Sequence, residues 1–289
     1  MQGLKRIGFY LTINFLVVMM LSVILAFVPM PQSTVISILI LCAVFGFLGS
    51  FISLALSRTI AKASYKVRVI GPGDMDPKAR FLYETIEAMA RHSSIKMPEV
   101  GIYPSADVNA FATGASKDKS MIAFSQGLMN RLSEDEIAAV AGHEMAHISQ
   151  GDMVSMTLVM GLVNTFVMFL ARIVALGVDI ALRDNRGRGG LGFFGYYFVV
   201  MLLQNGLMLL AMIPVSYYSR YREYRADRGA AELTGAGSMI SALQKIEEFY
   251  QMPKKQDSFA LAKINSKSKA SLFATHPHIS DRIERLRNL

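Results

Sequence analysis

Four long apolar runs are the feature that most limits what this chain can fold into. They cover residues 7–28, 35–56, 155–180 and 191–213. Each provides about the 20 residues that a helix needs to cross the hydrocarbon core of a bilayer. Charged residues make up only 18% of the chain, whereas about 25% is usual in soluble proteins. The sequence therefore predicts a mainly α-helical, multi-pass membrane protein.

Basic residues indicate on which side of the membrane the ends of the first two runs lie. They precede the first run and follow the second: Lys5, Arg6, Arg58, Lys62, Lys66 and Arg68. Because Lys and Arg gather on the cytoplasmic side of membrane spans, we expect the N-terminus and the segment after residue 57 in the cytoplasm. The first run is long and lacks a clear small-residue cleavage site, so we interpret it as a retained signal-anchor.

The runs divide the chain into four expected parts. Residues 1–57 form a transmembrane hairpin, and residues 58–152 form a cytoplasmic part of mixed α and β structure. Residues 153–215 form a second apolar hairpin, and residues 216–289 form a cytoplasmic helical part. This topology also accounts for the net charge of +8. Since no basic-aromatic motif accompanies the charge, we expect no nucleic-acid partner.

The second hairpin is open to two interpretations. Its runs contain Arg172, Asp179 and Gln204, and such residues are costly in lipid and usually face a helix bundle or a wet cavity. The link at residues 183–190 is basic, as a cytoplasmic loop would be. The hairpin could therefore be half-embedded or packed on the soluble part, but we expect two full spans. In both cases the chain returns to the side that it left, so residues before and after the hairpin can meet.

The segment from residue 69 to residue 152 has the pattern of a soluble α+β domain. Asp76 and Pro77 predict the start of a helix. Ser133 and Glu136 have the spacing of a capping box and predict the start of another. Strands are expected between these helices, at residues 99–103, 108–112 and 120–125.

The helix that Ser133 opens carries His143, Glu144 and His147 in an H-E-x-x-H arrangement. Residues four apart lie on the same face of a helix, so the two imidazoles can bind one zinc ion. Zinc lowers the pKa of bound water to about 7, and Glu144 is placed to accept the proton. The arrangement can also arise by chance. Small neighbours such as Ala141 and Ala146 favour the zinc site, because they leave room beside the imidazoles.

A catalytic zinc ion usually has a third protein ligand and one open position. The single cysteine, Cys42, lies in an apolar run, which leaves His and carboxylate side chains as candidates. Glu223 and Asp227 are four residues apart and share a helix face. We predict that Glu223 is the third ligand of one zinc ion per chain and that Asp227 orients a ligand histidine. The alternative is a solvated charged face on which both carboxylates pair with neighbouring arginines.

Taken together, these motifs resemble the HtpX family of bacterial membrane zinc peptidases, relatives of the CaaX prenyl endopeptidases. The resemblance covers essentially the whole chain, with NAFATG at residues 109–114, GHEMAH at 142–147, EYRAD at 223–227 and THPHISDRI at 275–283. It implies a cytoplasmic zincin-like catalytic domain beside the spans. His143, His147 and Glu223 would be zinc ligands, Glu144 the general base, and Asp227 a support behind the ligands.

The resemblance also implies a physiological role. Members cleave misfolded or damaged membrane proteins at the cytoplasmic face of the bacterial inner membrane, in protein quality control and the stress response. The expected partners are therefore membrane-protein substrates and the lipid bilayer. A scaffold or chaperone-like protein with a structural zinc ion, or a zinc hydrolase of lipidated substrates, is the alternative. A purely structural zinc site needs no general base, so Glu144 favours the peptidase.

Two further residues are candidates for substrate binding. The stretch at residues 108–112 is either a core strand or an edge strand that pairs with an extended substrate, which would place Asn109 at the substrate. His276 is either a surface or capping residue, or a group that stabilises the tetrahedral oxyanion.

Overall fold

The computed structural model describes residues 35–184, 187–251 and 276–289. The predicted first span at residues 7–28 lies outside the described residues. The contacts divide the chain into two compact units. Unit 1 consists of Met1–Phe51 and Leu158–Pro214, and unit 2 consists of Ile52–Thr157 and Val215–Leu289.

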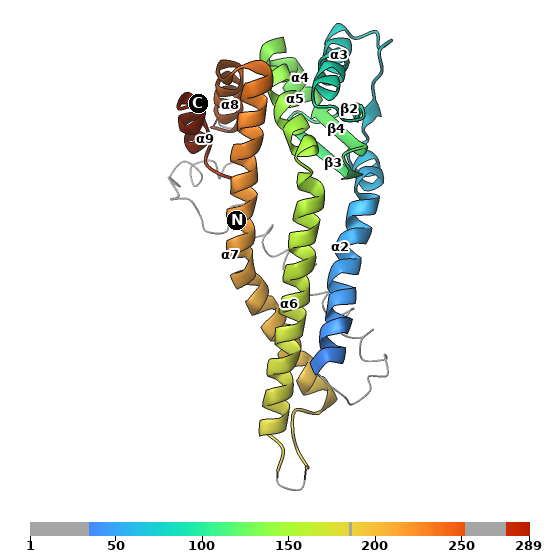
Figure 1. The fold of residues 1–289 in the computed structure, drawn as a ribbon, viewed down its shortest axis with the longest axis vertical. Coiled ribbons are helices and arrows are strands. Elements are labelled where there is room, and N and C mark those ends of the chain that lie inside the picture. The colour runs from blue at the N-terminus through green and yellow to red at the C-terminus, as the bar shows by residue number, and fades with distance from the viewer. Residues whose placement is uncertain (1–34, 185–186, 252–275) are drawn as a thin grey trace, which may run out of the picture. The chain divides into compact units, whose positions relative to one another are not determined.

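Helices make up most of the described chain (Figure 1). They are α2 (Val35–Tyr65), α3 (Pro77–His92), α4 (Gln126–Arg131), α5 (Glu134–Ser149), α6 (Asp152–Ala181), α7 (Gly192–Thr234), α8 (Ala236–Gln251) and α9 (Ile279–Arg287). Among the described residues, α2, α6 and α7 are long and apolar enough to cross a membrane. The prediction of a mainly helical membrane protein is confirmed.

The predicted boundaries of the second hairpin, residues 153 and 215, fall at the start of α6 and inside α7. α7 continues through Pro214 without interruption. Proline has no N–H to donate to the carbonyl one turn earlier, and spanning helices tolerate this where other groups satisfy the freed carbonyl. The helical part expected from residue 216 onward therefore begins inside one long helix.

The described part of unit 1 consists mainly of the apolar parts of these three helices. α2 and α6 approach closely, because Gly46 lies against the backbone of Thr165 and Gly161 lies against the ring of Phe47. α6 and α7 pack through Ala171, Ala175 and Val200, among others. In a membrane the hydrophobic effect does not drive helices together, and close contacts between small residues allow them to pack instead.

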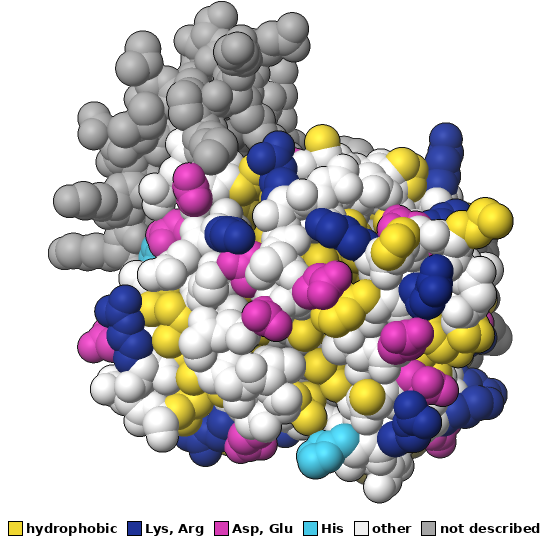
Figure 2. Space-filling model, turned by 90° about the horizontal axis from the view of Figure 1, so that it is seen from above, with side chains coloured by type: hydrophobic (Ala, Val, Ile, Leu, Met, Phe, Trp, Pro, Cys, Tyr) yellow, Lys and Arg dark blue, Asp and Glu magenta, His cyan; other side chains and the backbone are white. Residues whose placement is uncertain are grey.

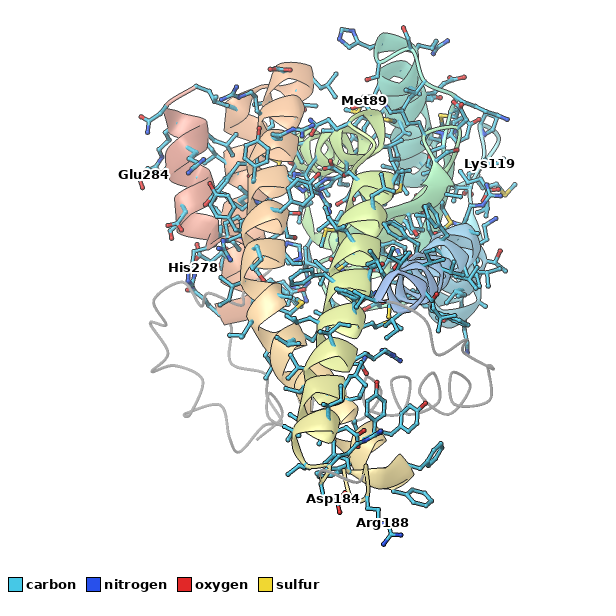
Figure 3. All side chains as sticks on the ribbon, turned by 60° about the horizontal axis from the view of Figure 1, so that its bottom comes forward. Met89, Lys119, Asp184, Arg188, His278 and Glu284 are labelled. Atoms are coloured by element: carbon cyan, nitrogen blue, oxygen red, sulfur yellow. The ribbon has the colours of Figure 1, made fainter. Side chains whose placement is uncertain are left out.

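The polar residues expected to face the interior of this bundle do so. Arg172, Asp179 and Gln204 are buried. Asp179 accepts a hydrogen bond of 2.7 Å from the backbone N–H of Leu191 and pairs with Arg183 at 2.6 Å. Figure 3 labels Asp184 and Arg188 in the link that follows, where the backbone N–H of Arg188 bonds to the Asp184 carboxylate. Arg183, the first basic residue of the link, is thus paired with a carboxylate of α6.

Unit 2 contains a four-stranded sheet of β1 (Arg68–Val69), β2 (Glu99–Tyr103), β4 (Lys119–Ser125) and β3 (Ala110–Ser116), in that order. β2 and β4 are parallel, and the other pairs are antiparallel. The prediction for residues 99–103 matches β2, and that for residues 120–125 lies within β4. The prediction for residues 108–112 overlaps β3, which begins later and forms an edge of the sheet.

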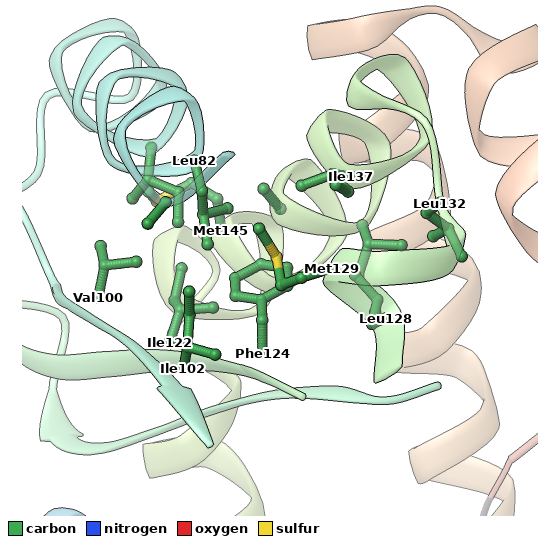
Figure 4. Close-up of a cluster of buried hydrophobic side chains, with 14 of the residues drawn as sticks. Leu82, Val100, Ile102, Ile122, Phe124, Leu128, Met129, Leu132, Ile137 and Met145 are labelled. Carbon is green, nitrogen blue, oxygen red and sulfur yellow. The ribbon is translucent and has the colours of Figure 1, made fainter. Parts of the chain in front are cut away.

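The core of unit 2 lies between the sheet and the helices α3, α4 and α5 (Figure 4). Leu82 and Ile137 approach from the helices, and Ile122 and Phe124 approach from β4; all four are fully buried. Burial of one such side chain contributes about 1.5–3 kcal/mol. This core fixes α5 against the sheet, and α5 is the helix that carries the H-E-x-x-H residues.

Both predicted helix starts are confirmed. The Asp76 carboxylate accepts a hydrogen bond of 3.0 Å from the backbone N–H of Lys78. The Ser133 hydroxyl accepts one of 3.4 Å from the N–H of Glu136, and the Glu136 carboxylate accepts one of 2.8 Å from the N–H of Ser133. α5 ends before Gly151, whose φ of 71° lies in the left-handed region that glycine adopts at no steric cost. The next helix therefore starts in a new direction.

Seen from above, the described surface of unit 2 mixes charges of both signs with hydrophobic side chains (Figure 2). α3 contributes to this face, which carries no functional prediction. The residues predicted to bind metal come instead from α5 and α7.

Candidate metal centre

α5 holds three of the predicted site residues in the interior of unit 2. His143, Glu144 and His147 are all buried. The two imidazole rings meet edge to face, with their centroids 4.7 Å apart. Both therefore face the same side of the helix, as the four-residue spacing predicts.

α7 brings Glu223 to these rings. One carboxylate oxygen, Oε2, lies 3.6 Å from Nε2 of His143, and the other, Oε1, lies 3.4 Å from Nε2 of His147. One ligand atom from each of the three residues lies within 4.8 Å of the other two. Two imidazoles and a carboxylate are a donor set that suits zinc. The residues therefore fit one divalent metal ion.

Asp227 lies behind His143, one helical turn beyond Glu223. Its Oδ1 is 3.0 Å from Nδ1 of His143. The guanidinium of Arg282, from α9, donates two hydrogen bonds to the same carboxylate. They run from Nε to Oδ2 at 2.8 Å and from Nη2 to Oδ1 at 2.5 Å. Asp227 and Glu223 are both buried, so the alternative of a solvated charged face does not describe them.

Asp152 occupies the corresponding place behind His147. Its Oδ2 is 2.7 Å from Nδ1 of His147, and Nε of Arg222 lies 3.3 Å from the same oxygen. Each imidazole thus faces Glu223 with Nε2 and a supporting carboxylate with Nδ1. A proton on Nδ1, donated to that carboxylate, leaves the Nε2 lone pair for a metal ion.

The close approach of α5 and α7 depends on small residues. A Cβ atom on Gly142 would lie 3.3 Å from Cα of Ala230, and one on Gly229 would lie 2.7 Å from Cβ of Ala146. Separations under about 3 Å are not tolerated without movement of the backbone. A side chain at position 229 would therefore force α5 and α7 to shift, and one at position 142 would make a tighter contact than usual.

The electrostatics of the group favour a cation between the ligands. Burial lowers the pKa of His147, but its hydrogen bonds to Asp152 and Glu223 outweigh burial and raise the pKa to about 9. For His143, hydrogen bonds to Asp227 and Glu223 likewise overcome burial and raise the pKa. Carboxylates that favour positive charge on these rings also favour a metal cation beside them.

Glu144 and His276 lie near the three potential ligands. Glu144 is close enough to His147 and Arg282 to act on both electrostatically. Nδ1 of His276 lies 3.2 Å from Oε2 of Glu223, while 70% of the His276 side chain is exposed. The structure therefore brings His276 to the group from the solvent side. By contrast, His278 is an exposed residue at the start of α9 (Figure 3).

Asn109 lies outside this immediate group. It precedes β3 and is exposed. Its backbone N–H donates to the Ser125 hydroxyl at 3.1 Å, and its carbonyl accepts from the backbone N–H of Ser125 at 2.9 Å. It also lines a cavity of about 560 Å³ together with Tyr65 and Tyr250.

Asp152, Arg222 and Arg282 were not predicted from the sequence to support the site. A signal for Asp152 was present, because it is the first carboxylate after His147 and lies beside the helix-ending Gly151. Arg282 lies within the THPHISDRI stretch, in which only His276 was given a candidate role. No spacing rule could connect either arginine to its carboxylate, because their partners come from other helices.

Comparisons with known proteins give matches that include these residues. Residues 77–289 match the family model of peptidase family M48. Protease HtpX of Shewanella baltica (strain OS185) is 44% identical over 289 residues, which cover 98% of this chain and 99% of the relative. Protease HtpX of Glaesserella parasuis serovar 5 (strain SH0165) is 42% identical over 286 residues, covering 99% and 100% of the two chains.

The fold is also found among solved structures. The crystal structure of S. mikatae Ste24p aligns with a TM-score of 0.62 at 20% sequence identity. The alignment covers 98% of this chain and 63% of the Ste24p chain, so the present chain spans less than two thirds of that protein. At this identity the similarity shows the fold alone.

Proposed function

Since this chain belongs to peptidase family M48, alongside the HtpX proteases, and is a membrane metalloendopeptidase, we propose that it is a zinc enzyme acting on membrane proteins at the cytoplasmic face of the bacterial inner membrane. The observation that carries the proposal is the group of three ligand atoms within 4.8 Å of one another, from His143, His147 and Glu223. Misfolded or damaged membrane proteins are the proposed substrates, and protein quality control under stress is the proposed role.

In this proposal, His143, His147 and Glu223 hold zinc, and Asp227 orients His143. When bound, the metal would supply Lewis acidity toward the scissile carbonyl and toward water. Glu144 takes the proton from the attacking water and passes it to the leaving amine. Its position one residue after His143 supports this role, since it lies beside the ligand atoms without being one of them.

His276 is proposed to stabilise the negative charge that develops on the carbonyl oxygen. Its exposed ring beside Glu223 supports this, because the ring is reachable by a substrate that enters from solvent. Arg282 also lies near Glu223, but its guanidinium already donates two hydrogen bonds to Asp227. We therefore assign the oxyanion to His276 and not to Arg282.

The edge strand β3 is proposed to bind the substrate backbone. The carbonyl of Asn109 bonds to Ser125, and Phe111 pairs with Ala123, on the inner side of β3. In an antiparallel pair, hydrogen-bonded and non-hydrogen-bonded positions alternate. The backbone groups of Ala110 and Ala112 therefore point to the free edge, where an extended peptide can add as another strand. Asn109 would lie at the start of this pairing.

The cytoplasmic location rests on charge and chain distance. Arg58, Lys62, Lys66 and Arg68 follow the second apolar run, as expected on the cytoplasmic side. His147 precedes Asp152, the first residue of α6, by five positions. The site would therefore lie near the membrane surface, where both water and segments of membrane proteins have access.

The test of this proposal is the Glu144→Gln variant, purified in detergent beside the wild type and the Glu134→Gln control. Glu134 lies in the exposed first turn of the same helix. We expect full zinc content in all three proteins. Cleavage of an unfolded membrane-protein substrate should fall by at least about 100-fold in Glu144→Gln alone, as for loss of a general base. Unchanged cleavage in that variant would remove Glu144 from the mechanism.

A further inference from the structure

Asp152 has no role in the proposed mechanism, yet it is among the most buried charged residues in unit 2, with 1% of its surface exposed. A buried carboxylate is costly unless it is paired. Its shortest contact is the 2.7 Å hydrogen bond to Nδ1 of His147. The residue therefore lies where it can control which nitrogen of His147 carries a proton.

We propose that Asp152 is a positioning residue that orients His147 for metal binding and strengthens this histidine as a ligand. The inference rests on the proposed function, because it takes His147 to be a metal ligand. A carboxylate behind a ligand imidazole fixes the ring and its tautomer and makes Nε2 a better electron donor. Asp152, at the start of α6, supports the ring of His147 in this way. Asp227, on α7, gives the same support to His143.

The two supporting carboxylates are not equivalent. Asp227 forms a two-point pair with Arg282, at 2.8 Å and 2.5 Å. Asp152 has a single contact of 3.3 Å with Nε of Arg222. A two-point pair withdraws more negative charge from a carboxylate than one longer contact does. More of the charge of Asp152 therefore remains available to His147.

Asp152 also has a structural function that the test must separate from this one. It is the acidic residue in the first turn of α6, where a negative charge stabilises the helix. Its pair with Arg222 additionally joins α6 to α7. Loss of either contact would lower the stability of the protein whether or not a metal is bound.

The experiment measures zinc affinity by competition with a chelator, at pH 7, in the full-length protein in detergent. Asp152→Asn keeps an oxygen that accepts from His147 but loses the charge, and Asp152→Leu loses both. Arg222→Met removes the ion pair and leaves the contact with His147. Asp135→Asn, in the exposed first turn of α5, is the matched control. Thermal unfolding of the metal-free proteins reports the structural contribution separately.

We expect the zinc dissociation constant to increase from wild type to Asp152→Asn and again to Asp152→Leu. In Asp152→Leu it should be about 10–100-fold higher than in wild type. Arg222→Met and Asp135→Asn should bind zinc within about twofold of wild type. Near-wild-type affinity in Asp152→Leu would overturn the proposal, and so would an equal loss in Arg222→Met. If Asp152→Leu does not fold, an unchanged affinity in Asp152→Asn is the overturning result. A wild type that binds no zinc would overturn the proposed function as well, which distinguishes the two failures.

Discussion

Both histidines of the metal group are held at both ring nitrogens, and this defines the site at the scale of single residues. Nε2 of each ring faces Glu223, and Nδ1 faces Asp227 or Asp152. Such double restraint keeps each ring in one orientation, which reduces the reorganisation needed when a metal binds. Glu223 is the shared element, because its two oxygens face different histidines.

Replacement of Glu223 by alanine should therefore cause the greatest loss of bound metal among single carboxylate changes. We expect zinc content to fall by at least about tenfold, because two imidazoles alone do not make a closed site. Metal analysis after dialysis measures this. Glu232→Ala, on the same helix and outside the group, should keep its zinc. Full occupancy in Glu223→Ala would show that another residue is the third ligand.

At the scale of elements, the site depends on how closely α5 and α7 pack. Gly142 and Gly229 face Ala230 and Ala146 across this contact. The ligands of one helix reach those of the other because nothing larger than a methyl group separates them.

The Gly229→Ala variant should weaken zinc binding without changing any ligand. The added Cβ would lie 2.7 Å from Cβ of Ala146, so the helices must separate or shift, at a cost of about 1–3 kcal/mol. Zinc affinity and thermal unfolding measure the two consequences. Gly237→Ala is the control, since its Cβ would meet nothing within 4 Å, and it should leave zinc binding unchanged. Equal affinities in both variants would contradict the packing argument.

The capping box at the start of α5 predicts a pH dependence of stability. Burial raises the pKa of Glu136, but bonds from Lys245, Ser241 and Ser133 outweigh burial and lower the pKa from 4.5 to about 2. A lowered folded-state pKa stabilises the protein above the unfolded-state value, and this stabilisation is lost as the pH falls toward about 2.

Glu136→Gln should therefore be less stable than wild type by about 1–3 kcal/mol at pH 7, allowing for screening at the half-exposed Lys245. The difference should shrink between about pH 4.5 and pH 2, the interval set by the two pKa values. Denaturant unfolding at a series of pH values measures it, with Glu134→Gln as the exposed control. A difference that stays constant down to pH 2 would show that the carboxylate charge contributes nothing.

At the scale of the whole molecule, the site joins residues on either side of a long apolar hairpin. His147 precedes α6, and Glu223 lies in the second part of α7. Both can lie in one aqueous compartment only if the hairpin crosses the membrane twice or not at all.

Labelling of single cysteines decides between these topologies. In a Cys42→Ser background, which removes the one native cysteine, we expect Arg188→Cys to react with an impermeant maleimide on intact spheroplasts. Asp118→Cys, in the turn between β3 and β4, should react only after lysis. Both positions are exposed. Protection of Arg188→Cys until lysis would show that the hairpin does not cross, and labelling of Asp118→Cys on intact cells would place the site outside.

Local rules were sufficient for much of this molecule. The three described spans follow from length and hydropathy, and the starts of α3 and α5 follow from Asp76 and the Ser133 capping box. Helical periodicity alone places the side chains of His143 and His147 on the same side of α5. The sequence also shows that Glu223 and Asp227 share a helix face. It does not decide whether these carboxylates belong to a metal site or to a solvated charged face.

Only the tertiary structure decided which groups meet. The burial of Glu223 beside both histidines, the carboxylates behind each ring, and the arginines that hold those carboxylates depend on packing between α5, α6, α7 and α9. Such contacts join residues up to 139 positions apart, as between His143 and Arg282. Hydrophobic periodicity sets which face of a helix is buried, but the partner of a buried charge is set by the close packing of whole helices, which no local pattern encodes.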